Sequence, residues 1–244
     1  MTKKPLKEKK QLKERWEIEE FVFDKKTLLT LGRIIKKGII DSLDYCVSTG
    51  KEANVYRATK GEKNLAVKIY KIETTGFERR HRYLEGDWRF KGIRWDERNI
   101  TYAFARKEFK NLEIAEKAGV HAPKPYYVEN NIVVMSFLGE GGLPYQKLKD
   151  AKIIREKDLK VILSDIKKMY MAGFVHGDIS EYNILLGDVP YMIDFSEGVV
   201  KGHPLFEELL ERDVRNILSY YEKNGIKKDF EKTLKWIREN KKDG

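Results

Sequence analysis

Residues 176–183 read His-Gly-Asp-Ile-Ser-Glu-Tyr-Asn, and residues 193–195 read Ile-Asp-Phe. Asn183 follows Asp178 by five positions, and Asp194 follows Asn183 by eleven. Phosphoryl transfer needs a carboxylate that orients or deprotonates the acceptor hydroxyl, together with hard oxygen ligands for Mg²⁺. Asp178 fits the first role and the other two residues fit the second. The apolar segments flanking both runs disfavour the alternative of a surface turn in which Asp and Asn only cap backbone groups.

A lysine upstream completes the pattern of a nucleotide-binding site. Lys68 follows three apolar residues in a predicted strand, as does the kinase lysine that binds the α- and β-phosphates and pairs with a glutamate on the next helix. Glu108, on a helix predicted over 101–119, is our choice for that glutamate, with Glu113 and Glu116 one to two turns further along. Alone, Lys68 would be interpreted as a surface lysine whose stem packs on the strand end.

The turn before that strand has a weak phosphate-loop pattern. Residues 48–55 read Ser-Thr-Gly-Lys-Glu-Ala-Asn-Val, which fits a kinase glycine-rich loop if Ser48 and Ala53 replace the outer glycines. A Walker A loop is excluded, because Glu52 follows the lysine where that motif requires Ser or Thr.

Hydrophobic periodicity predicts strands in the first half of the chain and helices in the second. The expected helices cover 24–40, 101–119, 148–172, 207–221 and 228–240, and the expected strands cover 45–58, 64–70, 125–128, 132–137, 184–186 and 191–193. Residues 73–99 show charge, aromatic residues and glycine without a period, which predicts a long mobile loop. We expect a basic tail over 1–23, an N-lobe over 24–138 and a C-lobe over 139–244, with the glycine-rich connector 139–144 at the boundary.

Composition narrows the class of protein. The 244 residues are 41% hydrophobic and 11% aromatic, which excludes a disordered chain. The longest charge-free stretch, 130–139, is shorter than the roughly 18 apolar residues of a membrane span. A single cysteine, Cys46, excludes an internal disulfide and a cysteine-based zinc site, and the start lacks a secretory apolar region. We therefore expect a soluble, cytoplasmic protein.

The net charge of +10 makes polyanions such as RNA plausible partners. Much of the excess lies in residues 1–15, where a charge run is more commonly a solvated tail than an RNA-contacting arm.

Taken together, residues 48–55, 176–183 and 193–195 resemble the RIO family of atypical protein kinases, and its Rio-one branch in particular. The resemblance extends over about 47–221. It implies an α+β, bilobal protein-kinase-like fold, with an antiparallel N-lobe sheet plus helix and a mostly helical C-lobe. It also implies ATP with Mg²⁺ or Mn²⁺ as cofactors, ATPase as well as serine/threonine kinase activity, and a role in maturation of the small ribosomal subunit.

The resemblance also assigns roles to individual residues. Lys68 contacts phosphate, Asp178 is the catalytic aspartate, and Asn183 and Asp194 bind the metal. Asp194 carries a second hypothesis, that it accepts the phosphoryl group as a phosphoaspartate; a carboxylate whose charge is offset by a metal can act as a nucleophile.

The nucleotide-binding residues come from the same resemblance. The adenine edge is expected to bind the hinge backbone at Ser136 and Leu138, behind Met135. The full predicted set is Val47, Ser48, Thr49, Gly50, Lys51, Glu52, Val55, Lys68, Glu108, Met135, Ser136 and Leu138.

Departures from ordinary protein kinases make peptide phosphorylation doubtful as the main task. Ser196 replaces the glycine after Asp194 and Phe195, Gly177 replaces the arginine before the catalytic aspartate, and no Ala-Pro-Glu follows. The fifty residues after Asp194 cannot hold both an activation loop and a full peptide-docking subdomain.

Two alternatives remain. Small-molecule phosphotransferases of the aminoglycoside and choline type share the His-Gly-Asp pattern, but they need a larger helical insertion than 139–172 provides. A catalytically inactive nucleotide-binding scaffold for RNA would not need to keep Lys68, Asp178, Asn183 and Asp194 together.

Overall fold

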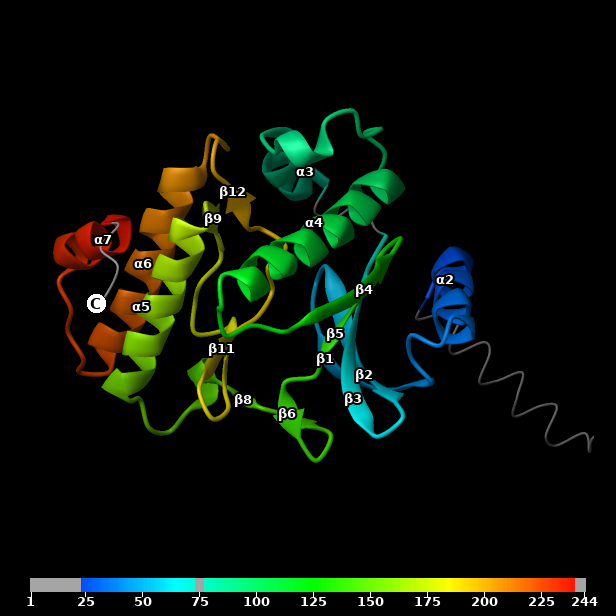
Figure 1. The fold of residues 1–244 in the computed structure, drawn as a ribbon, viewed down its shortest axis with the longest axis horizontal. Coiled ribbons are helices and arrows are strands. Elements are labelled where there is room, and N and C mark those ends of the chain that lie inside the picture. The colour runs from blue at the N-terminus through cyan, green and yellow to red at the C-terminus, as the bar shows by residue number, and fades with distance from the viewer. Residues whose placement is uncertain (1–22, 73–76, 240–244) are drawn as a thin grey trace, which may run out of the picture.

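The computed structural model of the chain describes residues 23–72 and 77–239. A five-stranded antiparallel sheet lies beside a group of helices, and α4 (Glu97–Lys117) runs across the sheet towards that group (Figure 1). The predicted α+β bilobal kinase-like fold is confirmed. The predicted basic tail lies outside the described residues, apart from its last position.

The sheet has the order β1-β2-β3-β5-β4. Its strands are β1 (Ser42–Thr49), β2 (Ala53–Lys60), β3 (Lys63–Tyr70), β4 (Pro125–Glu129) and β5 (Ile132–Ser136). The predicted strand over 45–58 is therefore two strands, β1 and β2, joined by the turn that contains Gly50. The strands over 64–70, 125–128 and 132–137 are confirmed to within two residues at each end.

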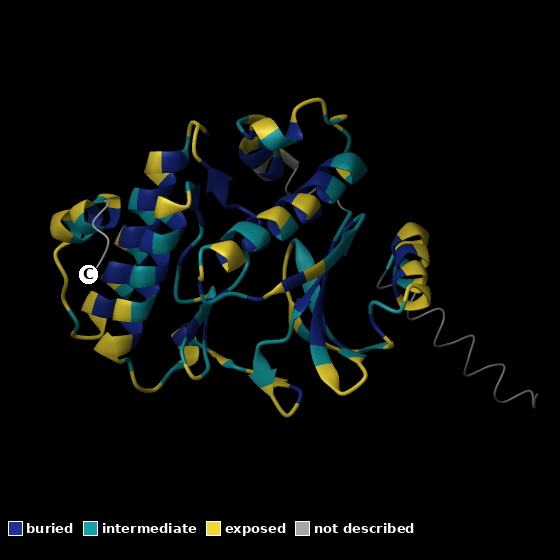
Figure 2. Cartoon of the chain, in the orientation of Figure 1, coloured by how far each residue is buried: buried dark blue, intermediate teal, exposed yellow. Residues whose placement is uncertain are grey.

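Side chains of β3 alternate between two hydrophobic cores, as the two-residue period of a strand requires. Ala66 and Tyr70 belong to the larger core, which includes residues of α4. Leu65 and Val67 belong to a smaller core against α2 (Lys25–Lys36). Lys68 therefore lies on the α4 side of the sheet, and Figure 2 shows that β3 is buried along most of its length.

The predicted N-terminal helix is confirmed as α2, although it is shorter than the expected range 24–40. Asp24 caps it by accepting hydrogen bonds from the backbone N–H groups of Lys26 (3.0 Å) and Thr27 (3.4 Å). Gly38, at φ 66°, follows its end, a left-handed conformation that glycine adopts without steric cost.

The prediction of a long loop over 73–99 is wrong for residues 77–99. They form α3 (Phe77–Glu85), a 3₁₀ turn η1 (Trp88–Phe90) and the start of α4, which begins at Glu97 instead of the expected Thr101. Polar side chains that read as solvated are buried here: Arg80 is 2% exposed and Asp87 1% exposed. Contacts with residues outside the segment, such as the hydrogen bond from Arg80 to Thr101 on α4 at 2.8 Å, thus order a segment whose sequence has no helical period.

The second half of the chain is mostly helical. It contains α5 (Glu156–Met171), α6 (Phe206–Lys223), α7 (Phe230–Arg238) and a 3₁₀ turn η2 (Leu148–Asp150). The short strands are β6 (Gly139–Glu140), β7 (Leu143–Pro144), β8 (Gln146–Lys147), β9 (Phe174–Val175), β10 (Ile184–Leu186), β11 (Pro190–Met192) and β12 (Val199–Val200). The connector 139–144 is thus a small hairpin, and the helix expected over 148–172 begins only at Glu156.

Among the described residues, none of the helices combines the length and the apolar character needed to cross a lipid bilayer.

Candidate active site

A cavity of about 560 Å³ lies between the sheet and the helical half of the molecule. Every residue that the sequence predicted for the site lines it. They are Val47, Ser48, Thr49, Gly50, Lys51, Glu52, Val55, Lys68, Glu108, Met135, Ser136, Leu138, Asp178, Asn183 and Asp194. Residues separated by more than a hundred positions in the sequence therefore share one cavity. Their individual roles stay predictions.

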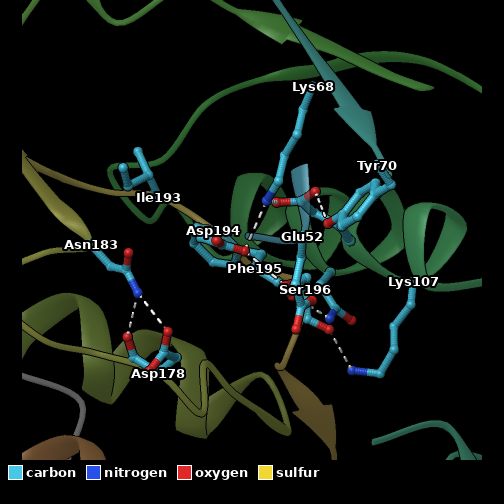
Figure 3. Close-up of polar contacts among 12 residues, drawn as sticks. Glu52, Lys68, Tyr70, Lys107, Asp178, Asn183, Ile193, Asp194, Phe195 and Ser196 are labelled. Carbon is cyan, nitrogen blue, oxygen red and sulfur yellow. Dashed lines mark hydrogen bonds and ion pairs between the residues drawn. The ribbon is translucent and has the colours of Figure 1, made fainter. Parts of the chain in front are cut away.

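Lys68 lies at the centre of a buried ionic cluster (Figure 3). Its Nζ is 2.7 Å from Oε1 of Glu108 and 2.8 Å from Oδ1 of Asp194. The Tyr70 hydroxyl donates to the other oxygen of Glu108, Oε2, at 2.5 Å. Of the three helical glutamates considered from the sequence, the structure pairs Glu108 with the lysine.

The cluster is strongly charged although little of it meets solvent. The side chains of Lys68 and Glu108 are 8% and 1% exposed, whereas that of Asp194 is 42% exposed and faces the cavity. Desolvation opposes the charge of Lys68, but Asp194 and Glu108 together raise its pKa well above the usual value. Desolvation likewise opposes the charge of Asp194, and Lys68 lowers the pKa of that carboxyl. The site thus holds an ammonium group and an ionised Asp194 side by side.

Burial dominates at Glu108, where desolvation raises the pKa and the neighbouring Lys68 lowers it only in part. The hydroxyl of Tyr70 donates to Glu108, and burial beside this carboxylate raises the pKa of the phenol well above 10. Tyr70 therefore remains a donor at any physiological pH.

The loop between β9 and β10 carries Asp178, the predicted catalytic aspartate. The amide of Asn183 donates through Nδ2 to the backbone oxygen of Asp178 (2.9 Å) and to its Oδ2 (2.7 Å). This contact fixes the orientation of both side chains (Figure 3). Asp213 on α6 accepts from the N–H groups of Gly177 (2.7 Å) and Ile179 (2.9 Å) and so holds the loop backbone.

His176 braces this loop. Its Nδ1 accepts from the N–H of Asp178 at 3.3 Å, so Nε2 carries the proton and donates to the carbonyl of Ile193 at 3.1 Å. Burial lowers the pKa of His176 to about 4, and the ring is therefore neutral.

The donor set at the end of β11 fits Mg²⁺. Oδ1 of Asp194 accepts hydrogen bonds from Lys68 and from Ser196 Oγ (2.8 Å), and Nδ2 of Asn183 donates twice to Asp178. The oxygens Oδ2 of Asp194 and Oδ1 of Asn183 are hard ligands of the kind that Mg²⁺ prefers. Within residues 23–72 and 77–239 no group of three or more His, Cys, Asp or Glu could hold a metal ion. Two protein ligands suffice for Mg²⁺ when nucleotide phosphates supply further oxygens.

The turn between β1 and β2 covers one side of the cavity. The N–H of Gly50 donates to the carbonyl of Ala53 at 2.9 Å, and a Cβ at Gly50 would come within 3.0 Å of that oxygen. One glycine is enough for this tight turn, which explains how Ser48 can stand where the glycine-rich loop of kinases has a glycine.

The predicted hinge follows β5. The N–H of Ser136 donates to the carbonyl of Lys124 at 2.8 Å, and the carbonyl of Leu138 accepts from Tyr145 at 3.0 Å. The carbonyl of Ser136 and the N–H of Leu138 are therefore the hinge groups that suit an adenine edge.

Sequence reasoning missed residues whose types are ordinary for their elements. Tyr70 and Ser196 touch predicted site residues and line the cavity, and Asp213 holds the backbone on both sides of Asp178. Only Tyr70 carried a signal: it stands two positions after Lys68 and thus on the same face of β3.

The fold and the site can now be compared with known proteins. Residues 54–233 match the RIO domain family. The chain belongs to the RIO family. The RIO-type serine/threonine-protein kinase Rio1 of Methanocaldococcus jannaschii is 40% identical over 219 residues, covering 88% of this chain and 75% of that protein. The Haloferax volcanii protein of the same name is 36% identical over 227 residues, covering 92% of this chain and 78% of that protein.

Solved RIO structures have the same fold. The Chaetomium thermophilum Rio2 kinase, determined as an ADP/Mg²⁺-phosphoaspartate complex, has a TM-score of 0.63 and 19% identity, with 86% of this chain and 66% of that one covered. The predicted membership of the RIO family is confirmed, and the prediction of a kinase enzyme agrees with the names of its relatives.

Proposed function

We propose that this RIO-family chain is an ATP-dependent serine/threonine phosphotransferase that also hydrolyses ATP and uses Mg²⁺. The observation that carries the proposal is the convergence of Lys68, Asp178, Asn183 and Asp194 on one cavity. A site of this kind catalyses by positioning the phosphates and neutralising their charge, because the transition state requires little covalent chemistry from the protein. The names of the Rio1 relatives support the same activity.

Each residue then has a distinct task. Lys68, held by Glu108 at 2.7 Å, binds the α- and β-phosphates. The Leu138 N–H and the Ser136 carbonyl orient the adenine. Mg²⁺ held by Asn183 and Asp194 would neutralise charge on the transferring phosphate. Asp178 takes the proton of the acceptor hydroxyl.

Asp194 is the proposed acceptor in ATP hydrolysis. One carboxylate oxygen forms a bond to the γ-phosphorus while the bond between that phosphorus and the bridging oxygen of ADP breaks. Water then attacks the phosphorus, and the carboxylate leaves, giving inorganic phosphate and a proton. The lowered pKa of Asp194 keeps the nucleophile ionised, and Lys68 and Ser196 hold its other oxygen.

Labelled ATP tests this route. The purified protein is incubated with γ-³²P-ATP and Mg²⁺ and compared with Asp178→Ala and Asp194→Ala. Asp188→Asn is the matched control, because Asp188 is an exposed carboxylate that accepts from Tyr191 at 2.8 Å outside the cavity. We expect protein-bound label that hydroxylamine removes and that Asp194→Ala abolishes.

The other outcomes identify the alternatives. Acid-stable phosphoserine that survives in Asp194→Ala would overturn the acyl-phosphate step and retain a kinase. Transfer of label to an added aminoglycoside would favour a small-molecule phosphotransferase. Absence of any ATP turnover with intact nucleotide binding would favour the scaffold.

The proposed partner is a precursor of the small ribosomal subunit. Family membership supports it, as does the net charge of +10, since fixed cations release counterions when they meet RNA phosphates. Pull-down with precursor and mature small subunits, with and without ATP, tests the assignment. Equal capture of an unrelated structured RNA at physiological salt would contradict it.

A further inference from the structure

Two buried donors on α4 lie outside the lining of the cavity. Lys107 and Asn111 are both 0% exposed and, four residues apart, share one face of the helix. Glu108 lies about a hundred degrees around the same helix and faces Lys68 instead. Helix α4 therefore presents polar groups in two directions.

Both donors reach the backbone directly after Asp194. Lys107 Nζ donates to the carbonyl of Ser196 at 3.1 Å and to that of Gly198. Asn111 Nδ2 donates to the carbonyls of Phe195 (2.7 Å) and Gly198 (3.0 Å). Figure 3 shows Lys107 extending towards the Ser196 side of the cluster. Three backbone carbonyls of residues 195–198 thus end on α4.

The amide of Asn111 is itself held in one orientation. Its Oδ1 accepts from Arg89 Nη2 at 2.9 Å, so its donors must face residues 195–198. Arg89 in turn pairs with Asp87 at 2.6 Å, and the side chain of Asp87 is fully buried. The α3–η1 segment therefore sets the direction in which Asn111 donates.

The backbone at this point has a conformation that needs support. Asp194 has φ 64°, a left-handed value that a non-glycine residue adopts only where its surroundings enforce it. A Cβ on Gly198 would come within 2.3 Å of Phe174, so the chain runs in close contact on its far side as well. Fixing residues 195–198 consequently fixes the direction in which the Asp194 carboxylate leaves the backbone.

We propose that Lys107 and Asn111 are positioning residues, which fasten residues 195–198 to α4 and thereby hold the Asp194 carboxylate in register with Lys68 and the metal. The inference rests on the proposed function, in which Asp194 meets the γ-phosphate and Mg²⁺. Neither residue lines the cavity. Helix α4 carries these two residues as well as Glu108. The same rigid helix therefore positions both Lys68 and Asp194.

The test uses the full chain with Lys107→Met and Asn111→Leu as independent single variants, each close in volume to the native residue. Lys110→Met is the matched control, because Lys110 is an exposed lysine on the same helix. Three quantities are measured: kcat for ATP, the Mg²⁺ concentration at half-maximal rate, and nucleotide affinity in EDTA. Thermal unfolding reports whether each variant is folded.

For Lys107→Met and for Asn111→Leu we expect kcat to fall about 10- to 100-fold, because a displacement of the Asp194 carboxylate by about 1 Å can cost that much. The Mg²⁺ midpoint should rise, the EDTA affinity should stay within about twofold, and Lys110→Met should match the wild type. Hydrogen exchange of residues 194–199 should accelerate in Lys107→Met and Asn111→Leu but not in Lys110→Met.

A purely structural role would lower the active fraction and leave the Mg²⁺ midpoint and the exchange rates of 194–199 unchanged, which would overturn the inference. Failure of the proposed function looks different, since the wild type itself would then show no ATP turnover or would tolerate Asp194→Ala. Hydrogen exchange still decides the inference in that case.

Discussion

Replacing Tyr70 by phenylalanine removes one hydrogen bond and almost nothing else. The ring keeps its edge contact with Phe104, at 5.9 Å between centroids, and remains near the Lys68 ammonium, 5.1 Å from the ring centre. The lost contact is the 2.5 Å bond to Glu108 Oε2. Tyr70 and Glu108 are each 1% exposed, so water cannot replace the hydroxyl.

The magnitude follows from the charge of the acceptor. Hydrogen bonds to charged groups contribute about 1.5–3 kcal/mol, and a buried acceptor left without its donor loses that amount. We expect Tyr70→Phe to lower the free energy of unfolding by about 2 kcal/mol, which for a chain of this size lowers Tm by about 4–8 °C. The KM for ATP should rise several-fold, because Glu108 then holds Lys68 less firmly.

Tyr221→Phe is the matched control. Tyr221 is 0% exposed, and its hydroxyl has no hydrogen-bond partner among the residues that the structure describes. Removal of that hydroxyl should therefore be neutral or slightly stabilising. Urea unfolding followed by circular dichroism measures both variants. If Tyr70→Phe is no more destabilising than Tyr221→Phe, the hydroxyl does not support Glu108 and the reasoning is refuted.

Two further predictions concern pH and backbone packing. Desolvation raises the pKa of Glu129, but hydrogen bonds from Lys37 and Arg33 lower it to about 2, so the folded state binds fewer protons than the unfolded state between about pH 2 and 5. Glu129→Gln should therefore lower the free energy of unfolding by about 1–2 kcal/mol at pH 7, a value reduced because Lys37 and Arg33 are half-exposed. The difference in stability between the variant and the wild type should vanish as pH falls to about 2 and below. A pH-independent difference in urea unfolding would contradict this. Gly198→Ala places a Cβ 2.3 Å from the ring of Phe174 and should cost about 1–3 kcal/mol. By contrast, a Cβ at Gly32 would meet no described atom within 4 Å outside its own helix, so Gly32→Ala should stabilise α2 by about 0.5–1 kcal/mol. Equal Tm shifts in the two alanine variants would show that the contact with Phe174 is not limiting.

The parts of the site that the sequence predicts are those encoded over short distances. Asp178 and Asn183 lie on one loop, and their five-residue spacing is reproduced by a direct hydrogen bond of 2.7 Å. Lys68 is placed by the period of a single strand. The choice of Glu108 over Glu113 and Glu116 also succeeds, because only one position of a helix can face a fixed point on the sheet.

The segment 77–99 shows why composition alone failed there. Its arginines and aspartates predict solvated chain, yet Arg80 donates to Thr101 at 2.8 Å, and Arg89, which pairs with Asp87, also donates to Asn111 at 2.9 Å. A charged residue is rarely buried without a polar partner, and that partner can lie many positions away. No local period records that pairing, so the order of this segment became visible only in the structure.

The role of Lys107 also depends on contacts between residues far apart in the sequence, so no local pattern predicts it. The direction of its side chain can nevertheless be derived once Glu108 is known to face Lys68. If Glu108 must face β3, the residue before it points about a hundred degrees away, and that direction leads to the chain emerging from Asp194. A hydrophobic residue there would leave the carbonyls of Ser196 and Gly198 with fewer donors in a buried site, which is costly. Two requirements therefore explain the donor at position 107. The Lys68–Glu108 pair fixes the rotation of α4, and the turn after Asp194 brings its backbone carbonyls to the side of the helix that carries residue 107. A helix that satisfies the first requirement alone would hold Lys68 correctly and leave Asp194 free to move away from it.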